Sequence, residues 1–333
     1  MTAVSWNRLK KIVSQFPRAS VLVIGDLILD EFIWGEVSRI SPEAPVPVVW
    51  AKSESFMPGG SCNVASNIRA LGGNAQVMGV VGRDARGKAL LDLLRQNGIG
   101  VDDVQADPAR PTTLKTRVIA HHQQVVRIDR EETFPISRRV LTVFIDRVRK
   151  RVPEVDAICV EDYGKGTITP ELVQEVVRLG RKHRKVITVD PKEEHLSYYR
   201  GVTAITPNHH EASALSRIKI IDENSLRKAG EKLLGALRCE NVLITQGEKG
   251  MTLFEKGRRP VRIPTVAQAV FDVSGAGDTV IGTFTLARAL GATPRESAVL
   301  ANCAAGVVVG KVGTAVASAR ELLGRARELL GKT

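Results

Sequence analysis

The sequence of 333 residues is poor in aromatic side chains, which make up 4% of it. Proteins that bind nucleic acids stack bases on such side chains, so their scarcity counts against that kind of partner. The net charge of +12 would favour a nucleic-acid partner, but the basic residues are spread among acids and form no basic tail. We therefore expect no nucleic-acid partner, and we assign the charge to a solvated surface and to small anionic substrates.

The chain also lacks an apolar run of about 18 residues, the length that a membrane-spanning helix requires. Residues 1–11 contain no apolar stretch of the signal-peptide type. Only four cysteines occur, and they lie far apart without forming a C-x-x-C pair, which predicts reduced core residues rather than a zinc site. We expect a cytoplasmic protein with no membrane partner.

Two common nucleotide-binding patterns are missing: the P-loop G-x-x-x-x-G-K-[ST] and the dinucleotide fingerprint G-x-G-x-x-G. Residues 275–278 instead read Gly-Ala-Gly-Asp, before an apolar pattern that predicts a helix over 277–290. Free N–H groups at such a helix start favour a phosphate, and Asp278 would suit a base that deprotonates a hydroxyl beside it. An Asp stabilised by the helix dipole explains the local pattern equally well.

The rest of the chain alternates between short apolar strands and helices. This rhythm predicts βαβ units, a parallel sheet covered by helices on both faces, and antiparallel edge strands over 250–255 and 259–263. Because no repeat or linker divides the sequence, we expect one α/β domain over residues 1–333. The predicted strands include 21–24, 157–161, 186–190, 204–206 and 241–245, and the predicted helices include 138–151, 170–183 and 226–237.

Residues 38–47 contain three prolines within six positions, which excludes a helix or a central strand there. With an edge strand over 46–51 and an alternating hairpin over 114–129, the pattern predicts a small β flap, or lid, near 32–51 and 112–129. Arg39 in this lid is expected to close over an anionic ligand, although a passive surface loop is the alternative. Because a projecting lid leaves two sides exposed, we expect two subunits to pair through it as a homodimer.

Polar residues follow several predicted strands. The carboxyl ends of parallel strands share one edge, so together with residues 275–278 they suggest a phosphoryl-transfer crevice. Asp26 and Asp30 suggest hydrogen bonds to sugar hydroxyls, and each residue alone is also consistent with a cap or a turn. The other residues at strand ends are Asp162, Lys165, Asp190, Lys192, Asn208, Glu211 and residues 245–250.

Four motifs resemble, in order and spacing, those of the ribokinase-like (PfkB-type) sugar kinases over essentially the whole chain. They are Pro-Gly-Gly-Ser-Cys-Asn at 58–63, Thr-Pro-Asn-His-His-Glu at 206–211, Thr-Gln-Gly-Glu-Lys-Gly at 245–250 and Gly-Ala-Gly-Asp at 275–278. The resemblance implies a three-layer α/β/α sandwich with a mostly parallel central sheet and a β lid. It also implies a kinase that uses ATP and Mg²⁺.

Within this family, residues 38–47, 189–192 and 304–311 resemble the kinases of the ADP-heptose pathway. Those kinases phosphorylate the C1 hydroxyl of a heptose 7-phosphate. They are often fused to a nucleotidyltransferase, and from where the sequence stops we expect the single-function form without that domain.

The resemblance implies a role for each matching position. Asp278 would be the catalytic base, and the N–H groups of Gly275, Ala276 and Gly277 would stabilise the transferring phosphoryl group. Glu211 would hold Mg²⁺ through water. The remaining residues would be Lys192, Asn208, His209, His210, Thr245, Gly247 and Gly250 for the nucleotide, Asp26, Asp30, Gly59, Gly60 and Asn63 for the sugar, and Asp272 and Ser274 for a monovalent cation such as K⁺.

A substrate phosphate distant from C1 would need a cation at the far rim of the sugar pocket. We expect an arginine there, with Arg117 ahead of Arg39 and Arg127, because its planar fork grips phosphate oxygens in pairs. Two alternatives remain. One is another kinase of this family with a different sugar or sugar phosphate, and the other is a binding protein without catalysis, for which a base beside a phosphate would have no use.

Overall fold

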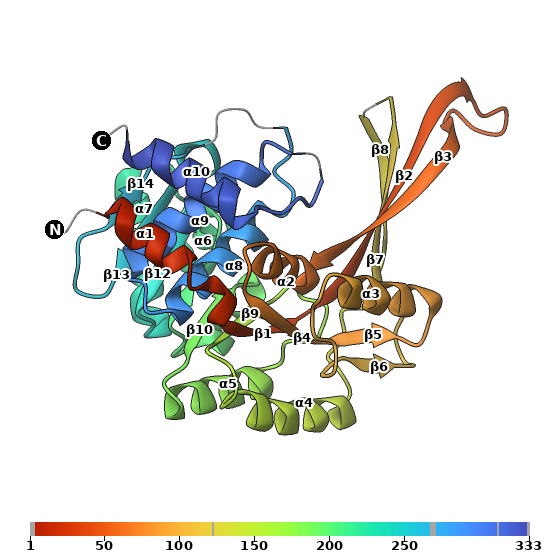
Figure 1. The fold of residues 1–333 in the computed structure, drawn as a ribbon. Coiled ribbons are helices and arrows are strands. Elements are labelled where there is room, and N and C mark those ends of the chain that lie inside the picture. The colour runs from red at the N-terminus through yellow and green to blue at the C-terminus, as the bar shows by residue number, and fades with distance from the viewer. Residues whose placement is uncertain (1–3, 122, 267–270, 312, 332–333) are drawn as a thin grey trace.

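The structure is a computed structural model that describes residues 4–121, 123–266, 271–311 and 313–331. Its centre is an eight-stranded sheet in the order β14-β13-β12-β11-β10-β9-β1-β4 (Figure 1). Neighbouring strands are parallel from β4 across the sheet to β12, and β13 and β14 are antiparallel strands at the other edge. The strands are β1 (Ser20–Gly25), β4 (Asn74–Met78), β9 (Ala157–Glu161), β10 (Val186–Asp190), β11 (Ala204–Ile205), β12 (Asn241–Thr245), β13 (Met251–Glu255) and β14 (Val261–Ile263).

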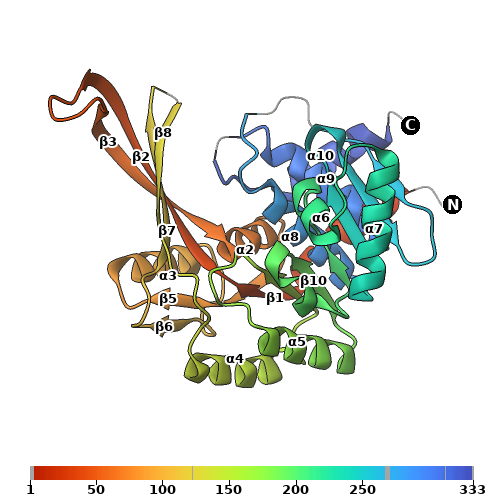
Figure 2. The same cartoon turned by 180° about the vertical axis from the view of Figure 1, so that it is seen from behind.

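Helices cover both faces of this sheet, as the front and back views show (Figures 1 and 2). In β1, Val21 and Val23 face one hydrophobic core while Leu22 and Ile24 face the other, which is why the strand is a continuous apolar run. The prediction of a three-layer α/β/α sandwich is therefore confirmed. One layer holds α1 (Trp6–Val13), α2 (Ser61–Ala70), α8 (Ala276–Ala289), α9 (Pro294–Val308) and α10 (Ala319–Leu330), and the other holds α4 (Arg138–Arg151), α5 (Pro170–Lys182), α6 (His209–Ser216) and α7 (Glu223–Leu237).

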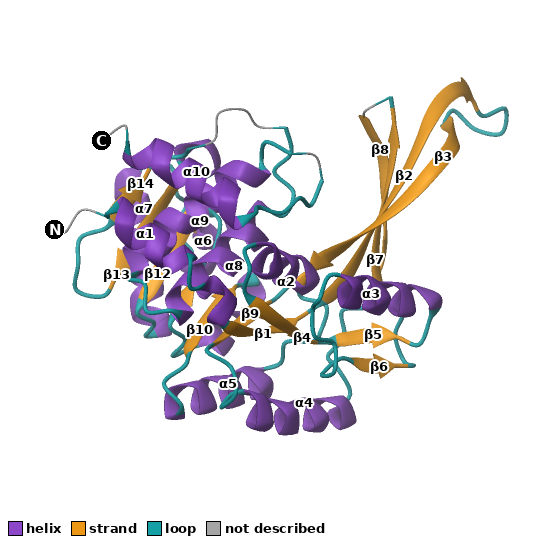
Figure 3. Cartoon of the chain, in the orientation of Figure 1, coloured by secondary structure: helices purple, strands orange, loops and turns teal. Residues whose placement is uncertain are grey.

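A second sheet, in the order β3-β2-β7-β8, projects from the main body beyond α2 and α3 (Ala85–Gln96). Strands β2 (Leu27–Ile40) and β3 (Pro47–Gly60) form a long hairpin, with β7 (Thr113–Ala120) parallel to β2 and antiparallel to β8 (Gln123–Arg130). The outer half of this sheet carries no helix on either side (Figure 3). We call the whole four-stranded sheet, with its hairpin loops, the lid. It contains the expected segments near 32–51 and 112–129.

Smaller elements complete the described chain. None of its helices is long and apolar enough to cross a membrane. The four cysteines are buried and free, as expected for reduced core residues. The smaller elements are the strand pair β5 (Val80–Gly82) and β6 (Gln105–Asp107) and the short 3-10 helices η1 (Phe16–Arg18), η2 (Glu193–Tyr199) and η3 (Gly247–Lys249).

Candidate active site

A glycine turn leads into α8. Gly275 adopts the left-handed conformation with φ of 74°, and a Cβ atom there would lie 2.5 Å from the Asn63 side-chain amide, so only glycine fits. The Ala276 N–H already donates to the Val273 carbonyl at 3.2 Å, whereas those of Gly275 and Gly277 have no partner among the described residues. The anion hole expected from three N–H groups therefore has two free donors in this structure, at Gly275 and Gly277.

Asp278 lies in the first turn of α8 and is 4% exposed. Asn63 on α2 donates to its Oδ2 at 2.6 Å, and the Tyr163 hydroxyl, from the loop after β9, donates to its Oδ1 at 3.0 Å. Burial raises the pKa of Asp278 to about 6, although both hydrogen bonds favour the ionised form. A carboxylate with a pKa near neutrality suits a general base.

A buried polar network fixes Asn63 in place. Asn67, one turn later on α2, donates to the Asn63 carbonyl at 3.0 Å, and the Thr279 hydroxyl of α8 donates to Asn67 Oδ1 at 2.9 Å. Asn67 and Thr279 are fully buried. Sequence analysis did not identify Asn67, because 212 residues separate it from its partner and only the packing of α2 on α8 brings them together.

Two further carboxylates lie close to Asp278, at the ends of β9 and β10. Glu161, Asp190 and Asp278 each have an oxygen within 4.8 Å of those of the other two. Burial raises the pKa of Glu161 and of Asp190 well above the usual range, and repulsion among the three acids adds to this. Glu161 was missed as a site residue, although its place at a strand end could have indicated it.

Asp30, which is expected to bind the sugar, is close enough to this centre for its charge to raise the pKa of Asp278. It belongs to β2 rather than to a turn after β1, and it is 4% exposed. A Cβ atom on Gly59 would lie 2.5 Å from Asp30 Oδ2, so the glycine leaves room for the carboxylate, and Gly60 follows with φ of 55°. Arg117 Nη1 donates to Asp30 Oδ1 at 2.5 Å. The structure thus brings Arg117 to Asp30, with which it already pairs.

Asp26 has a different place from the one we expected. Its carboxylate is 1% exposed and accepts backbone N–H groups of Tyr163 at 3.0 Å, Lys165 at 3.0 Å and Thr167 at 3.1 Å. Both oxygens are therefore used to hold the loop after β9. The predicted contact with sugar hydroxyls is corrected, because in this structure Asp26 shapes the loop and faces no crevice.

Arg39 and Arg127 are not brought to Asp278. Arg39 is exposed on the outer part of β2, roughly 30 Å along the strand from Asp30 at about 3.3 Å per residue. Arg127 on β8 pairs with Asp129 at 3.0 Å and its side chain is 52% exposed. In this structure Arg39 is therefore far from Asp30, and its closure over an anionic ligand stays a prediction.

Lys115 and Lys165 carry positive charges that act on each other. Lys165 is one of the strand-end residues expected at the crevice, whereas sequence analysis did not identify Lys115. Lys115 on β7 pairs in register with Asp30, and its ammonium has no hydrogen bond or ion pair within the described ranges. Burial and the nearby charge of Lys165 lower the pKa of Lys115. Lys165 donates to Glu131 Oε1 at 2.6 Å. The alternation of β7 beside Arg117 was the signal that could have indicated Lys115.

Asn208 and Glu211 form a capping box at the start of α6. Asn208 Oδ1 accepts the N–H groups of His210 and Glu211 at 2.9 and 3.0 Å, and Glu211 Oε2 accepts the Asn208 N–H at 2.8 Å. The rings of His209 and His210 lie 3.8 Å apart in this first turn. Burial raises the pKa of Glu211, and the positive charge of Lys192 opposes that rise. Asn208, His209, His210 and Glu211 therefore lie together at the start of α6, and Lys192, before η2, is close enough for its charge to act on Glu211.

The loop after β12 lies beside that terminus. Thr245 pairs with Asn208 through a parallel bridge, and its N–H donates to the Pro207 carbonyl at 3.0 Å. Gly247 and Gly250 have φ of 59° and 83°. A Cβ atom on Gly250 would lie 2.2 Å from a backbone oxygen of β14, so the loop needs glycine there.

Asp272 and Ser274 occur in one turn before α8. Asp272 accepts the N–H of Ser274 at 2.9 Å with Oδ1 and that of Gly313 at 3.0 Å with Oδ2. The two residues expected at a monovalent cation are thus adjacent, and residues 267–270 beside them lie outside the described residues.

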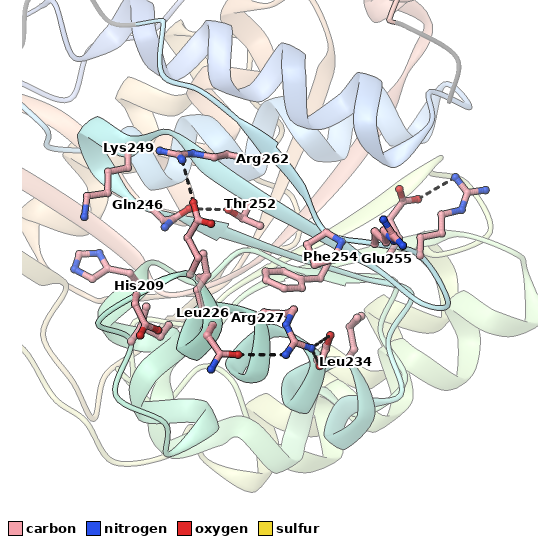
Figure 4. A pocket seen from close by; sticks show the side chains of 18 of the residues that line it. His209, Leu226, Arg227, Leu234, Gln246, Lys249, Thr252, Phe254, Glu255 and Arg262 are labelled. Atoms are coloured by element: carbon pink, nitrogen blue, oxygen red, sulfur yellow. Dashed lines mark hydrogen bonds and ion pairs between the residues drawn. The ribbon is translucent and has the colours of Figure 1, made fainter.

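A large cavity of about 1820 Å³ lies between α7, the loop after β12 and the β13–β14 hairpin (Figure 4). His209, Gln246 and Lys249 reach one side of it, and Leu226 and Phe254 give it an apolar wall. Neither Asp278 nor residues 275–277 line this cavity. It therefore borders the loops expected at the nucleotide without reaching the proposed reaction centre.

A buried carboxylate beside free N–H donors thus lies at the start of α8, close to the carboxyl ends of the parallel strands β9 and β10, where open α/β sheets bind their ligands. The family profile described as "pfkB family carbohydrate kinase" matches residues 18–320. The chain belongs to the pfkB family of carbohydrate kinases.

Relatives named "Bifunctional protein HldE" match most of the chain. The protein from Desulfatibacillum aliphaticivorans is 45% identical over 310 residues, which cover 93% of this chain and 63% of the relative. The protein from Geobacter sulfurreducens is 46% identical over 318 residues, which cover 95% of this chain and 65% of that relative. The chain thus spans less than two thirds of the length of these relatives.

Solved structures share the fold at lower identity. Arabidopsis thaliana ribokinase, complexed with ribose and ATP, is 21% identical with a TM-score of 0.74, covering 93% of this chain and 99% of that one. Phosphofructokinase-2 from Escherichia coli, in complex with substrates and products, is 20% identical with a TM-score of 0.77. The match covers 94% of this chain and 99% of that one. The ribokinase-like fold predicted from the sequence is confirmed.

Proposed function

We propose that this kinase transfers the γ-phosphate of ATP to the C1 hydroxyl of D-glycero-β-D-manno-heptose 7-phosphate, giving the 1,7-bisphosphate of ADP-heptose biosynthesis. The observation that carries phosphoryl transfer is Asp278, buried beside free N–H donors at the start of α8. The choice of sugar is supported by 45% identity to HldE and by residues 38–47, 189–192 and 304–311, which resemble the kinases of that pathway.

In this reaction the Asp278 carboxylate takes the proton of the C1 hydroxyl. The hydroxyl oxygen then forms a bond to the γ-phosphorus, the bond from that phosphorus to the β,γ-bridging oxygen breaks, and ADP leaves with the electron pair. The N–H groups of Gly275 and Gly277 donate to the equatorial oxygens as charge redistributes. Asn63 fixes the base throughout, through its 2.6 Å hydrogen bond.

The residues at the start of α6 fit a divalent cation that accompanies ATP. Burial and the charge of Glu211 raise the pKa of Asp190, so a cation near Glu211 would relieve an existing repulsion. Oxygen ligands of this kind suit Mg²⁺, which Glu211 would hold through water. When bound, Mg²⁺ neutralises charge on the phosphates. Lys192, Asn208, His209, His210, Thr245, Gly247 and Gly250 are proposed for the nucleotide, and Asp272 and Ser274 for K⁺.

Two assays test the function. The purified chain is given ATP, Mg²⁺ and a panel of sugars and sugar 7-phosphates, and we expect the fastest turnover with the heptose 7-phosphate. Equal turnover of phosphorylated and unphosphorylated sugars would favour another sugar kinase of the family.

The second assay changes Asp278→Asn, which keeps the shape of the side chain but removes the base. We expect kcat to fall by roughly 10²–10⁴-fold, with the KM for ATP hardly changed and the melting temperature at the assay pH not reduced. Near-normal kcat in this variant would exclude Asp278 as the base. We further propose that the enzyme acts in the cytoplasm as a homodimer paired through the lid.

A further inference from the structure

Tyr163 contacts the proposed base but has no part in the reaction as described above. Its hydroxyl donates to Asp278 Oδ1 at 3.0 Å while Asn63 donates to Oδ2 at 2.6 Å, so each oxygen of the base has one donor. We propose that Tyr163 is a positioning residue that orients the Asp278 carboxylate toward the sugar hydroxyl and keeps it ionised. This inference rests on the proposed function, because it takes Asp278 as the base.

The loop that carries Tyr163 is held from two sides by buried carboxylates. Asp26 on one side accepts the N–H group of Tyr163 itself at 3.0 Å, with two more from the same loop. Asp162 on the other side accepts the Tyr199 hydroxyl at 2.7 Å and lies 2.8 Å from His195 Nδ1. A side chain on a backbone fixed in this way can hold a partner at constant distance and angle.

The surroundings of Tyr163 keep its hydroxyl a donor. Burial and the neighbouring carboxylates raise the pKa of Tyr163 well above its usual value, so the proton stays on the phenol oxygen. The Lys115 ammonium lies 5.3 Å from the centre of the Tyr163 ring, on the side of the lid. Tyr163 therefore contacts the base through its hydroxyl and the Lys115 ammonium through its ring.

A hydrogen bond to an ionised carboxylate stabilises that form and lowers its pKa. Without the Tyr163 hydroxyl, the pKa of Asp278 would rise from about 6 toward or above neutrality. A smaller share of the enzyme would then carry the base in its active form at neutral pH, and the carboxylate could rotate about its Cβ–Cγ bond. The other ionisable groups that act on Asp278 or are acted on by it are Asp30, Lys115, Cys159, Glu161 and Asp190.

The test is Tyr163→Phe, which removes one oxygen atom and keeps the ring. With ATP, Mg²⁺ and the sugar that the wild type phosphorylates fastest, we expect kcat to fall roughly tenfold at pH 7 and the KM for ATP to stay unchanged. The acidic limb of the kcat–pH profile, along which the rate falls as Asp278 takes a proton, should move upward by about one pH unit. A residue with only a structural role would lower the melting temperature without moving that limb.

Tyr198→Phe is the matched control. Tyr198 on η2 stacks on His195 at 4.6 Å, and its hydroxyl has no hydrogen-bond partner in the described part of the chain. We expect wild-type kcat and an unshifted pH profile from this variant. A Y163F enzyme that matches Y198F in both readouts, while D278N is inactive, would overturn the inference and leave the proposed function intact. An active D278N, or no turnover of any sugar by the wild type, would overturn both.

A second substitution covers the case in which Y163F melts below the assay temperature. Placing 3-fluorotyrosine at position 163 keeps the ring and the hydroxyl but makes the phenol a stronger donor. The acidic limb should then move to lower pH, because the ionised carboxylate is stabilised further. A limb that does not move in this folded enzyme would overturn the inference.

Discussion

Arg117 and Arg127 each have a carboxylate partner, whereas the Lys115 ammonium has no ion pair in the described chain. Arg117 binds Asp30 at 2.5 Å, and Arg127 binds Asp129 at 3.0 Å. Lys115 is partly buried, and both its burial and the charge of Lys165 lower its pKa. A phosphate near Lys115 would relieve that repulsion, so we assign the far phosphate of the sugar to Lys115 rather than to the expected Arg117.

Lys115→Ala should therefore lower kcat/KM for the heptose 7-phosphate by roughly 10- to 150-fold, the effect of one charge-assisted hydrogen bond. The same heptose without its phosphate should be affected far less, because it makes no such contact and loses only the effect of the Lys115 charge on the pKa of Asp278. Steady-state kinetics with both sugars measure the difference. Lys52→Ala is the control, since Lys52 lies over the Trp50 ring on the outer lid.

Arg117→Ala gives a different pattern if this assignment is right. Its loss frees Asp30, which we expect to bind hydroxyl groups of the sugar ring, so the variant should impair both sugars alike. A loss confined to the phosphorylated sugar in Arg117→Ala, with Lys115→Ala behaving as wild type, would return the role to Arg117.

Among the elements, the loop over residues 162–167 shows how one buried carboxylate can set a local structure. Three of its N–H groups converge on Asp26, which is 1% exposed. An asparagine at that place has one acceptor oxygen, and its NH₂ group would face a backbone donor. A buried donor left without an acceptor costs about 1–3 kcal/mol.

We therefore expect Asp26→Asn to lower the free energy of unfolding by about 1–3 kcal/mol, measured by urea denaturation. Because the same loop carries Tyr163, kcat should fall as well. Asp102→Asn serves as the control, since Asp102 is exposed and unpaired within the described ranges. A variant as stable as this control would show that the three hydrogen bonds to Asp26 do not stabilise the fold.

The elements that the sequence predicts best are those with local start and stop signals. The helix expected over 277–290 is α8 at Ala276–Ala289, because Gly275 and Gly291 mark its ends. The parallel strands are predicted equally well from the sequence, because strands buried on both faces are continuous apolar runs. The capping box at Asn208 and Glu211 is also local, which is why its motif was visible.

The parts that sequence analysis missed depend on contacts between distant segments. Asp26 and Asp30 look alike in the sequence, yet one is turned into the loop after β9 and the other is paired with Arg117. Tyr163 lies between two residues that the sequence singled out, but the direction of its hydroxyl is set by Asp26 and α8. Such orientations arise from tertiary packing, which residue spacing does not encode.

At the scale of the whole molecule, the lid is the part whose surface a single chain leaves uncovered. Seven of the eleven exposed large hydrophobic residues in the described ranges lie on it, and every residue of β8 is exposed. Apolar side chains gathered on a projecting sheet are typical of an interface between subunits. The seven are Ile40, Val46, Trp50, Phe56, Val125, Val126 and Ile128.

We expect light scattering at micromolar concentration to give twice the chain mass of 36.1 kDa. Ile128→Asp, on the lid, should shift the mass to that of one chain, because a stable interface of about 1,200–2,000 Å² cannot bury an unpaired carboxylate at its centre without a large loss. Ile221→Asp is the matched control, since Ile221 is 75% exposed and lies outside the lid, whereas Ile128 is 56% exposed. A wild-type monomer at this concentration would contradict the homodimer. A dimer that Ile128→Asp leaves intact while Ile221→Asp disrupts it would place the interface outside the lid.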